Sequence, residues 1–267
     1  MYPRFDQFVR ERKYLMNVSP ATISWYKHAE KWLPNESPSE QELKAMVIRM
    51  REAGLKPTGA NAAIRAINAY LRWSESPHKI PQLKEPYTVM PTFSDTQVSS
   101  IIKHRPNQPV SQRTHILALI LMDTGARISE ILALRWSDID FDNMLLTLHG
   151  KGNKDRIVPF SHELRKRLFK FPNNDGYLPK VNGILFPVGR CAVLRSVKIM
   201  CRSLGFEPPK RTLHSFRHTF ALNYVRRGGS VFHLQKALGH SSLEMSRRYV
   251  ALSTDDMKAS HRSPLTS

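Results

Sequence analysis

The chain has few cysteines, few acidic side chains and no long apolar run, and each shortage excludes a class of protein. Cys191 and Cys201 are its only cysteines, without the CxxC spacing of a zinc site or the density of a disulfide-stapled fold. We therefore expect two buried thiols in a reducing compartment. No apolar stretch is long enough to span a membrane, and the N-terminus lacks the apolar core of a signal peptide. These absences predict a cytoplasmic protein without a membrane segment.

The shortage of acidic residues leaves a strongly basic chain. Its 267 residues include 41 Lys and Arg against 22 Asp and Glu, a formal net charge of +19. Residues 1–90 carry 14 of the basic and 9 of the acidic side chains, so most of the excess lies after residue 90. Such a balance favours a polyanionic partner, most simply nucleic acid. Charge alone would also fit a ribosome-associated factor.

Proline divides the sequence into two domains. Residues 1–75 show apolar side chains at helical spacing in four short segments, which predicts a small helical bundle. Residues 76–91 hold four prolines and no sustained periodicity, so we expect a linker there. Residues 92–267 would form the second domain.

The second domain is expected to be helical around one small sheet. Met144–His149 alternates like a strand, G-K-G-N-K-D has turn chemistry, and Arg156–Phe160 reads as a second strand. Helical periodicity resumes on both sides of this hairpin. The predicted fold class is mainly α with a small antiparallel β-sheet, and Lys151 is expected near the tip of the hairpin.

Six polar side chains in the second domain together suit the transfer of a phosphoryl group. Two guanidiniums can hold phosphate oxygens in a bidentate manner, and an ammonium can protonate a leaving oxygen. Two imidazoles can bond the phosphate or move a proton, and a phenol can attack once nearby cations favour the phenolate. In chain order they are Arg127 in D-T-G-A-R-I-S-E, Lys151 in G-K-G-N-K-D-R, His214 and Arg217 in L-H-S-F-R-H-T, His240 in L-G-H-S-S, and Tyr249 in S-R-R-Y-V.

In this order and spacing the six residues resemble the active site of the tyrosine recombinases, the lambda-integrase and Xer type of DNA strand-exchange enzyme. The resemblance covers residues 93–252 by motif, and 1–75 only by the number and position of helices. It implies a core-binding, SAM-like helical domain followed by a mixed α/β catalytic domain with a C-terminal tail. It also implies that Tyr249 cuts DNA through a 3′-phosphotyrosyl intermediate and that strands are exchanged through a Holliday junction. Neither a metal ion nor ATP would be needed.

The resemblance also suggests roles for residues beside the six. Glu130, in R-I-S-E-I-L, matches an acidic position of the family and is expected to be a buried partner of a catalytic arginine; the alternative is a surface helix charge. Lys154 and Arg156 are read as contacts to the DNA backbone. The first domain adds four basic side chains that could meet phosphates beside aromatic residues, although those aromatics are also natural core positions. The four are Lys27, Lys31, Arg65 and Arg72.

The partners implied are double-stranded DNA at recombination or attachment sites and further copies of this chain. The 18 residues after Tyr249 are expected to dock on a neighbouring protomer and to couple the active sites of a tetramer on DNA. The alternative is a frayed or self-packed terminus. The sequence does not give the target site, the direction of the reaction, the participation of accessory DNA-bending proteins, or the genetic setting: a phage, a transposon, an integron or chromosome-dimer resolution.

Two other functions remain open at this point. A type IB topoisomerase uses the same chemistry but returns each strand to its original partner; the helical first domain favours recombination, since such a module supports site recognition and synapsis. A non-catalytic regulator would use residues 218–240 as a helix-turn-helix. That interpretation predicts that DNA binding does not depend on Tyr249, and it gives Arg127 and Lys151 no functional role.

Overall fold

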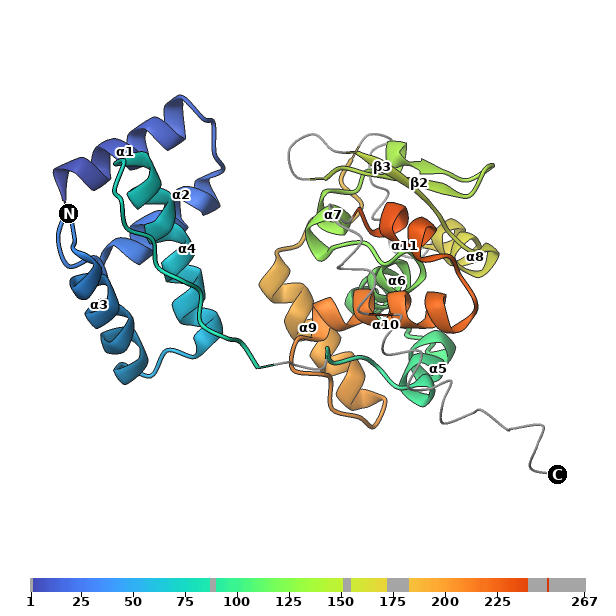
Figure 1. Cartoon of the computed structure of the whole chain (residues 1–267). Helices are drawn as coiled ribbons and strands as arrows, with labels where there is room; N and C mark the ends of the chain where they lie inside the picture. Colours follow the sequence, from blue (N-terminus) through green and yellow to red (C-terminus); the bar gives the residue numbers. More distant parts are fainter. Residues whose placement is uncertain (1, 87–89, 151–154, 172–182, 240–248, 250–267) are drawn as a thin grey trace, which may run out of the picture. The chain divides into compact units, whose positions relative to one another are not determined.

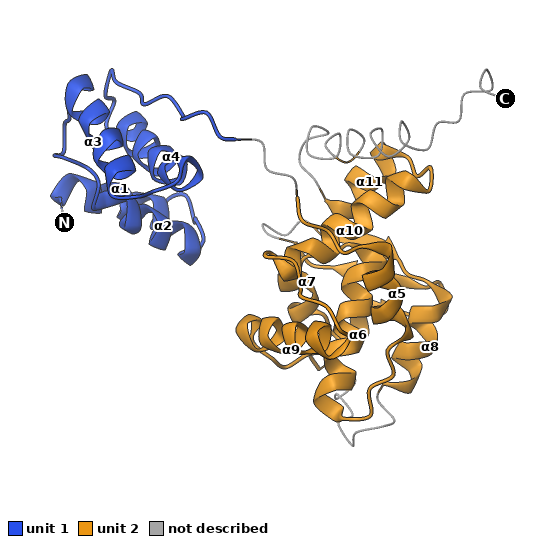
Figure 2. Ribbon diagram, turned by 90° about the horizontal axis from the view of Figure 1, so that it is seen from below, with its two compact units in different colours: residues 1–88 blue, residues 89–267 orange. Residues whose placement is uncertain are grey.

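A computed structural model describes residues 2–86, 90–150, 155–171, 183–239 and 249 (Figure 1). The chain separates into two compact units, Met1–Thr88 and Val89–Ser267 (Figure 2). Helices dominate both, and the second contains one three-stranded antiparallel sheet. The predicted fold class is therefore confirmed. Among the described helices, none combines the length and the apolar character that crossing a membrane requires.

The first unit is a four-helix bundle whose helix starts follow local capping signals. Ser39 accepts a hydrogen bond from the backbone N–H of Glu42, whose carboxylate bonds back to Ser39, so the two form a capping box. Ser19 caps the second helix ahead of a proline at the first helical position. The helices are α1 (Pro3–Tyr14), α2 (Pro20–Glu30), α3 (Glu40–Glu52) and α4 (Pro57–Trp73).

Aromatic rings fill the centre of this bundle. Phe8 lies 4.9 Å from Tyr26 and 5.7 Å from Trp73 between ring centroids. Trp73 also donates a hydrogen bond from Nε1 to Glu11 over 2.6 Å. Tyr26 is thus a buried core residue, and Trp73 is partly buried and packs against the core. Both fit the alternative that the aromatic residues of this domain are core positions.

Part of the segment expected to be a linker is bonded to helix α4. The side-chain oxygen of Asn68 accepts a hydrogen bond from the backbone N–H of Ile80, and its side-chain NH2 donates one to the carbonyl of Ile80. Asn61 makes the same two hydrogen bonds with Leu83. The buried side chain of Ile80 joins the bundle core. The extended chain up to this point therefore packs on the first unit.

The second unit is built around a buried helix and a small sheet. Helix α6 (Pro109–Thr124) is buried on nearly all sides and packs against helices on several of its faces. The sheet order is β1-β2-β3, with Leu146 opposite Val158 and both side chains in the core. The other elements are α5 (Asp95–Lys103), α7 (Ile128–Ala133), a short 3-10 helix (Trp136–Asp138), β1 (Ile139–Asp140), β2 (Leu145–Leu148), β3 (Arg156–Pro159), α8 (His162–Lys170), α9 (Arg190–Ser203), α10 (Thr212–Arg226) and α11 (Val231–Leu238).

The two cysteines differ in environment. Cys201 is fully buried on α9, and burial raises the pKa of its thiol to about 11. Cys191, in the first turn of the same helix, is exposed. The expectation that both thiols are buried is wrong for Cys191, because the two positions lie on different sides of one helix and only one side meets the core.

Candidate active site

Arg127 and Arg217, 90 positions apart in the sequence, lie close together at the C-terminal end of α6. Helix α6 ends at Gly125, whose φ of 63° is the left-handed conformation that glycine adopts without strain. The chain then reverses, and Arg127 becomes the N-cap of α7. From α10, Arg217 donates a hydrogen bond from Nη1 to the carbonyl of Gly125 over 2.8 Å. The two arginines thus share one corner of the second unit.

Arg217 is a buried cation, with 7% of its surface exposed. Its Nη2 donates to the carbonyl of Leu238, the last residue of α11, over 2.6 Å. Burial, with a contribution from nearby Arg127 and Arg156, lowers the pKa of Arg217 to about 9. This value is above neutral pH, so the guanidinium remains charged. The carbonyl end of a helix carries partial negative charge, which favours a cation in this place.

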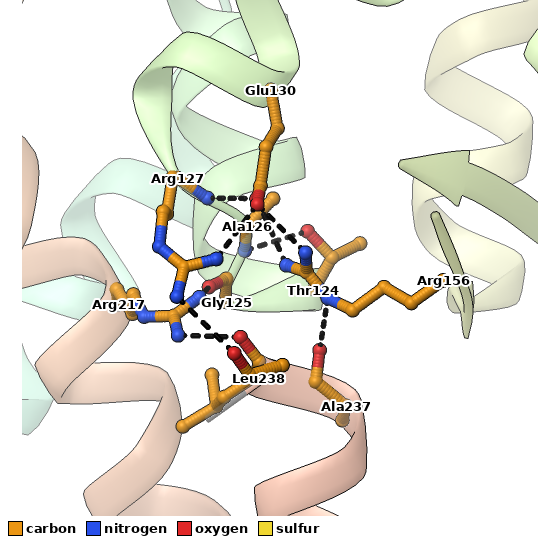
Figure 3. A network of polar contacts seen from close by, with 10 residues as sticks. Thr124, Gly125, Ala126, Arg127, Glu130, Arg156, Arg217, Ala237 and Leu238 are labelled. Carbon is orange, nitrogen blue, oxygen red and sulfur yellow. Dashed lines mark hydrogen bonds and ion pairs between the residues drawn. The ribbon is translucent and has the colours of Figure 1, made fainter. Parts of the chain in front are cut away.

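Three arginines from three different elements converge on the last carbonyls around the end of α11 (Figure 3). Arg156 of β3 donates from Nε to Ala237 over 2.7 Å, and Arg127 donates from Nη2 to Gly239 over 3.4 Å. Together with Arg217 they satisfy carbonyl groups that have no partner inside a helix. The arginines therefore fix the point from which the chain runs on towards His240 and Tyr249.

Glu130 holds two of these arginines. Its side chain is 4% exposed, and its carboxylate accepts hydrogen bonds from the backbone N–H and Nη1 of Arg127 and from Nη1 and Nη2 of Arg156, all between 2.7 and 2.9 Å. Burial alone would raise the pKa of this carboxyl, but the hydrogen bonds from Arg156 and Arg127 outweigh it and lower the pKa to about 2. Glu130 is a buried partner of Arg127 and not a surface helix charge.

Arg156 occupies a different environment from the one its sequence suggested. Its side chain is 11% exposed, and each of its three guanidinium nitrogens is bonded to Glu130 or Ala237. The Arg156 side chain therefore links β3 to α7 and to the end of α11. The predicted contact with the DNA backbone has no support in this geometry.

His214 shares helix α10 with Arg217, three residues earlier and therefore on the same side. It is exposed, and its Nε2 lies 3.5 Å from Nη2 of Arg190 at the start of α9. Partial burial and the charges of Arg190 and Arg211 lower the pKa of His214. Sequence reasoning missed Arg190, because no spacing connects it with the six motif residues.

Tyr249 lies against the same helix. It is 3% exposed and packs with Ala221, Leu234 and Leu238. Its hydroxyl oxygen is 2.7 Å from Nδ1 of His218, the residue next to Arg217. His218 was also missed from the sequence, although its place in H-x-x-R-H, directly after a motif arginine, was a usable signal.

Three of the predicted site residues, Lys151, His240 and Lys154, lie outside the described residues. The four basic residues assigned to DNA in the first unit are described, and all four are exposed; they are Lys27, Lys31, Arg65 and Arg72. Within the second unit the described part of the site is a corner rich in positive charge, with Arg127 41% exposed and His214 open to solvent. Such a corner suits a phosphate group.

Comparison with known proteins identifies relatives along nearly the whole chain. The model of the "Phage integrase family" matches residues 91–255, more than half of the chain. The tyrosine recombinase XerA of Pyrococcus furiosus is 28% identical over 235 residues, which cover 83% of this chain and 79% of the relative. The tyrosine recombinase XerD of Yersinia pestis is 26% identical, with coverage of 91% and 86%.

Solved structures share the fold. The integrase of the Tn1549 transposon, in complex with transposon right-end DNA, superposes with a TM-score of 0.76 at 21% identity, covering 97% of this chain and 98% of that one. The XerH recombinase bound to a palindromic substrate gives a TM-score of 0.71 at 17% identity, with coverage of 96% and 82%. The structural likeness thus extends over both units of the chain.

Proposed function

Because the chain belongs to the phage integrase family, and is thus an enzyme of site-specific DNA recombination that cleaves and rejoins strands, we propose that Tyr249 is its nucleophile. The observation that carries the proposal is the contact of Tyr249 with helix α10. Its hydroxyl bonds to His218 at 2.7 Å, and the preceding residue, Arg217, is a buried guanidinium. The side chain that contacts the proposed nucleophile and a cation for its target thus come from adjacent positions of one helix.

In the proposed reaction the Tyr249 oxygen attacks a DNA phosphate and forms a 3′-phosphotyrosyl bond. Arg127, Arg217 and His214 would stabilise the charge that grows on the non-bridging oxygens. Lys151 would protonate the leaving 5′ oxygen as a general acid. The energy of the broken bond stays in the phosphotyrosine, so a second DNA end can reverse the step without ATP. Two such exchanges would pass through a Holliday junction.

Double-stranded DNA is the proposed partner of both units. Two of the similar structures, of a transposon integrase and of XerH, are complexes with DNA. This chain brings a net charge of +19 and exposed basic residues on α2 and α4, which would bind phosphates. We also propose that the protein acts in the cytoplasm, because its proposed DNA substrate is there.

For self-association we propose that the C-terminal tail of one protomer occupies a pocket on the next. A pocket of about 500 Å³ lies among α5, α6, α8 and α10; apolar side chains line most of it, and its charged lining residues are Asp123, Glu163 and Arg227. Residues 250–267 offer matching groups, among them Met257, Lys258 and Arg262. Tetramers would follow if each copy donated its tail to one neighbour.

The pocket is tested with one variant in it and one outside it. Ile102→Glu places a charge in the pocket, whereas Ile199→Glu changes another exposed isoleucine, on α9 and outside the pocket. We expect Ile102→Glu to bind a single DNA site as the wild type does but to lose assembly of paired sites in analytical ultracentrifugation. Ile199→Glu should assemble normally. Equal assembly by the two variants would contradict the pocket assignment.

The nucleophile is tested with nicked, end-labelled DNA that spans the boundaries of the protein's own genetic element. We expect wild-type protein to leave a protein-linked 3′ end on a denaturing gel, also in EDTA, and Tyr249→Phe to leave none while binding DNA normally. Tyr224→Phe, a second tyrosine of the same region, is the matched control and should form the adduct. An adduct with Tyr249→Phe would refute the assignment.

The same substrates separate the alternative functions. Joining of labelled strands from two different duplexes indicates recombination, whereas relaxation of supercoiled DNA without exchange would indicate a topoisomerase. Tight site-specific binding with no adduct by the wild type would indicate a regulator.

A further inference from the structure

The hydroxyl of Tyr249 is held by a side chain that does not belong to the six-residue motif. Nδ1 of His218 lies 2.7 Å from the Tyr249 oxygen, and the two rings are 6.0 Å apart between centroids. His218 follows Arg217 on α10, four residues after His214. The contact therefore lies inside the corner that would receive the phosphate.

His218 is neutral in the free protein. Burial, followed by the charges of His214, Arg217 and Arg211, lowers the pKa of its imidazole to about 4. A neutral imidazole has one nitrogen free to accept a proton, and the Tyr249 hydroxyl has one to donate. A DNA phosphate bound beside Arg217 would offset the positive charges that depress the basicity of His218. His218 would therefore become a stronger base when substrate arrives.

Burial makes a proton acceptor necessary at this place. Tyr249 is 3% exposed and packed among aliphatic side chains, so bulk water has little access to its ring. A buried phenolate without compensation is costly, and the proton has to move to a group in contact as the oxygen attacks. His218 already makes that contact. His214, by comparison, is exposed and faces Arg190, a position suited to the phosphate itself.

We propose that His218 is a catalytic residue that accepts the proton of Tyr249 during DNA cleavage and returns it during rejoining. The inference rests on the proposed role of Tyr249 as the nucleophile. In cleavage the Tyr249 oxygen bonds to phosphorus while its O–H proton passes to Nδ1 of His218. The bond from phosphorus to the 5′ oxygen breaks, and that oxygen keeps the electron pair and takes a proton from Lys151. Rejoining reverses each transfer.

Two substitutions separate proton transfer from simple hydrogen bonding. His218→Asn places an amide near the position of Nδ1, which can bond the hydroxyl but cannot take its proton, and His218→Phe removes both abilities while keeping a ring. His233→Asn changes an exposed histidine of α11 and serves as the control. We expect both His218 variants to bind DNA like the wild type and to form the 3′ adduct at least roughly 100-fold more slowly. The control should react at the wild-type rate.

A modified substrate shows which proton is involved. A 5′-bridging phosphorothiolate has a leaving group that needs no protonation, so it should restore cleavage by Lys151→Ala but not by His218→Asn. Cleavage by His218→Asn at the wild-type rate on normal DNA, or its rescue by the phosphorothiolate, would overturn the proposal.

Failure of the underlying function gives a different pattern. If the wild type forms no adduct, or Tyr249→Phe forms one, Tyr249 is not the nucleophile and the role of His218 falls with it. If the wild type reacts, Tyr249→Phe does not, and His218→Asn equals the wild type, only the role of His218 is refuted.

Discussion

Glu130 and Arg156 form a two-pronged ion pair, with Oε1 2.7 Å from Nη1 and Oε2 2.9 Å from Nη2. The pair joins α7 to β3, and the remaining nitrogen of Arg156 joins both to Ala237 at the end of α11. The same carboxylate holds Arg127. A residue with no part in the chemistry therefore determines where a proposed catalytic guanidinium lies.

We expect Glu130→Gln to lower the free energy of unfolding by about 3–5 kcal/mol, because it removes one charge of a buried pair and leaves Arg156 uncompensated. Adduct formation should fall as well, since Arg127 loses its anchor. Denaturant titration and the cleavage assay measure the two effects. Glu163→Gln is the control: its pair with Arg167 is 53% exposed on the Glu163 side, so the loss should stay below about 1 kcal/mol. Equal losses would contradict the structural role of Glu130.

Arg156 and Lys154 were given the same role from the sequence, and the structure allows a direct comparison. Arg156→Ala should cost about 3 kcal/mol or more in unfolding free energy, because Glu130 would keep a buried charge without this partner. Lys154→Ala should leave stability unchanged, weaken DNA binding for all sequences, and reduce the salt slope of the affinity by about 1. If Arg156→Ala is stable and shows the reduced salt slope, the original prediction of a backbone contact is correct.

The sequence predicts the elements of the second unit best where local chemistry decides them. Ser94 caps α5, and a serine directly before a helix is an ordinary start signal. The alternation around Leu146 and Val158 forms the predicted strand pair. Helices α8 and α9 were not predicted. For α9 a usable signal existed, since Val193, Val197, Met200 and Cys201 are spaced to line one buried face.

The candidate site shows where sequence reasoning stops. The residue types of the motif indicate the chemistry, and the resemblance predicted Glu130 as a buried partner of one of the motif arginines. In the structure that arginine is Arg127, three positions away. The link from Arg156 to Glu130 crosses 26 positions, and the link from His218 to Tyr249 crosses 31. Contacts between distant positions depend on how the helices pack, and a single sequence gives no spacing rule for them.

Gly125 combines two constraints, and we expect Gly125→Ala to be strongly destabilising. A methyl group there would lie 2.3 Å from Cδ1 of Phe220 and 2.9 Å from Cδ2 of Leu238, in addition to the strain of a φ of 63°. The carbonyl that holds Arg217 belongs to this residue, so cleavage should fall too. Gly205→Ala is the matched control, because its φ of 83° is strained but nothing lies within 4 Å of the added carbon.

For Gly205→Ala we expect a loss of about 1–2 kcal/mol from the backbone alone, and for Gly125→Ala a clearly larger one. Thermal or denaturant unfolding of the two variants measures the difference. Equal losses would show that the packing against Phe220 relaxes without cost.

The buried His115 should make the protein lose stability in mild acid. Its side chain is 3% exposed, with Nε2 2.8 Å from the carbonyl of Ile101, and burial lowers its pKa to about 4. Above the unfolded pKa of roughly 6.5 both states are neutral and its full contribution is present. As the pH falls from there towards 4, the unfolded chain binds a proton that the folded protein does not, so the free energy of unfolding decreases, by about 2 kcal/mol at pH 5.

His115→Gln, measured by denaturant titration at pH 7.5 and pH 5, should remove that part of the decrease, whereas the exposed His233→Gln should keep it. A decrease of the same size in His115→Gln would show that other groups, and not His115, bind the proton on unfolding.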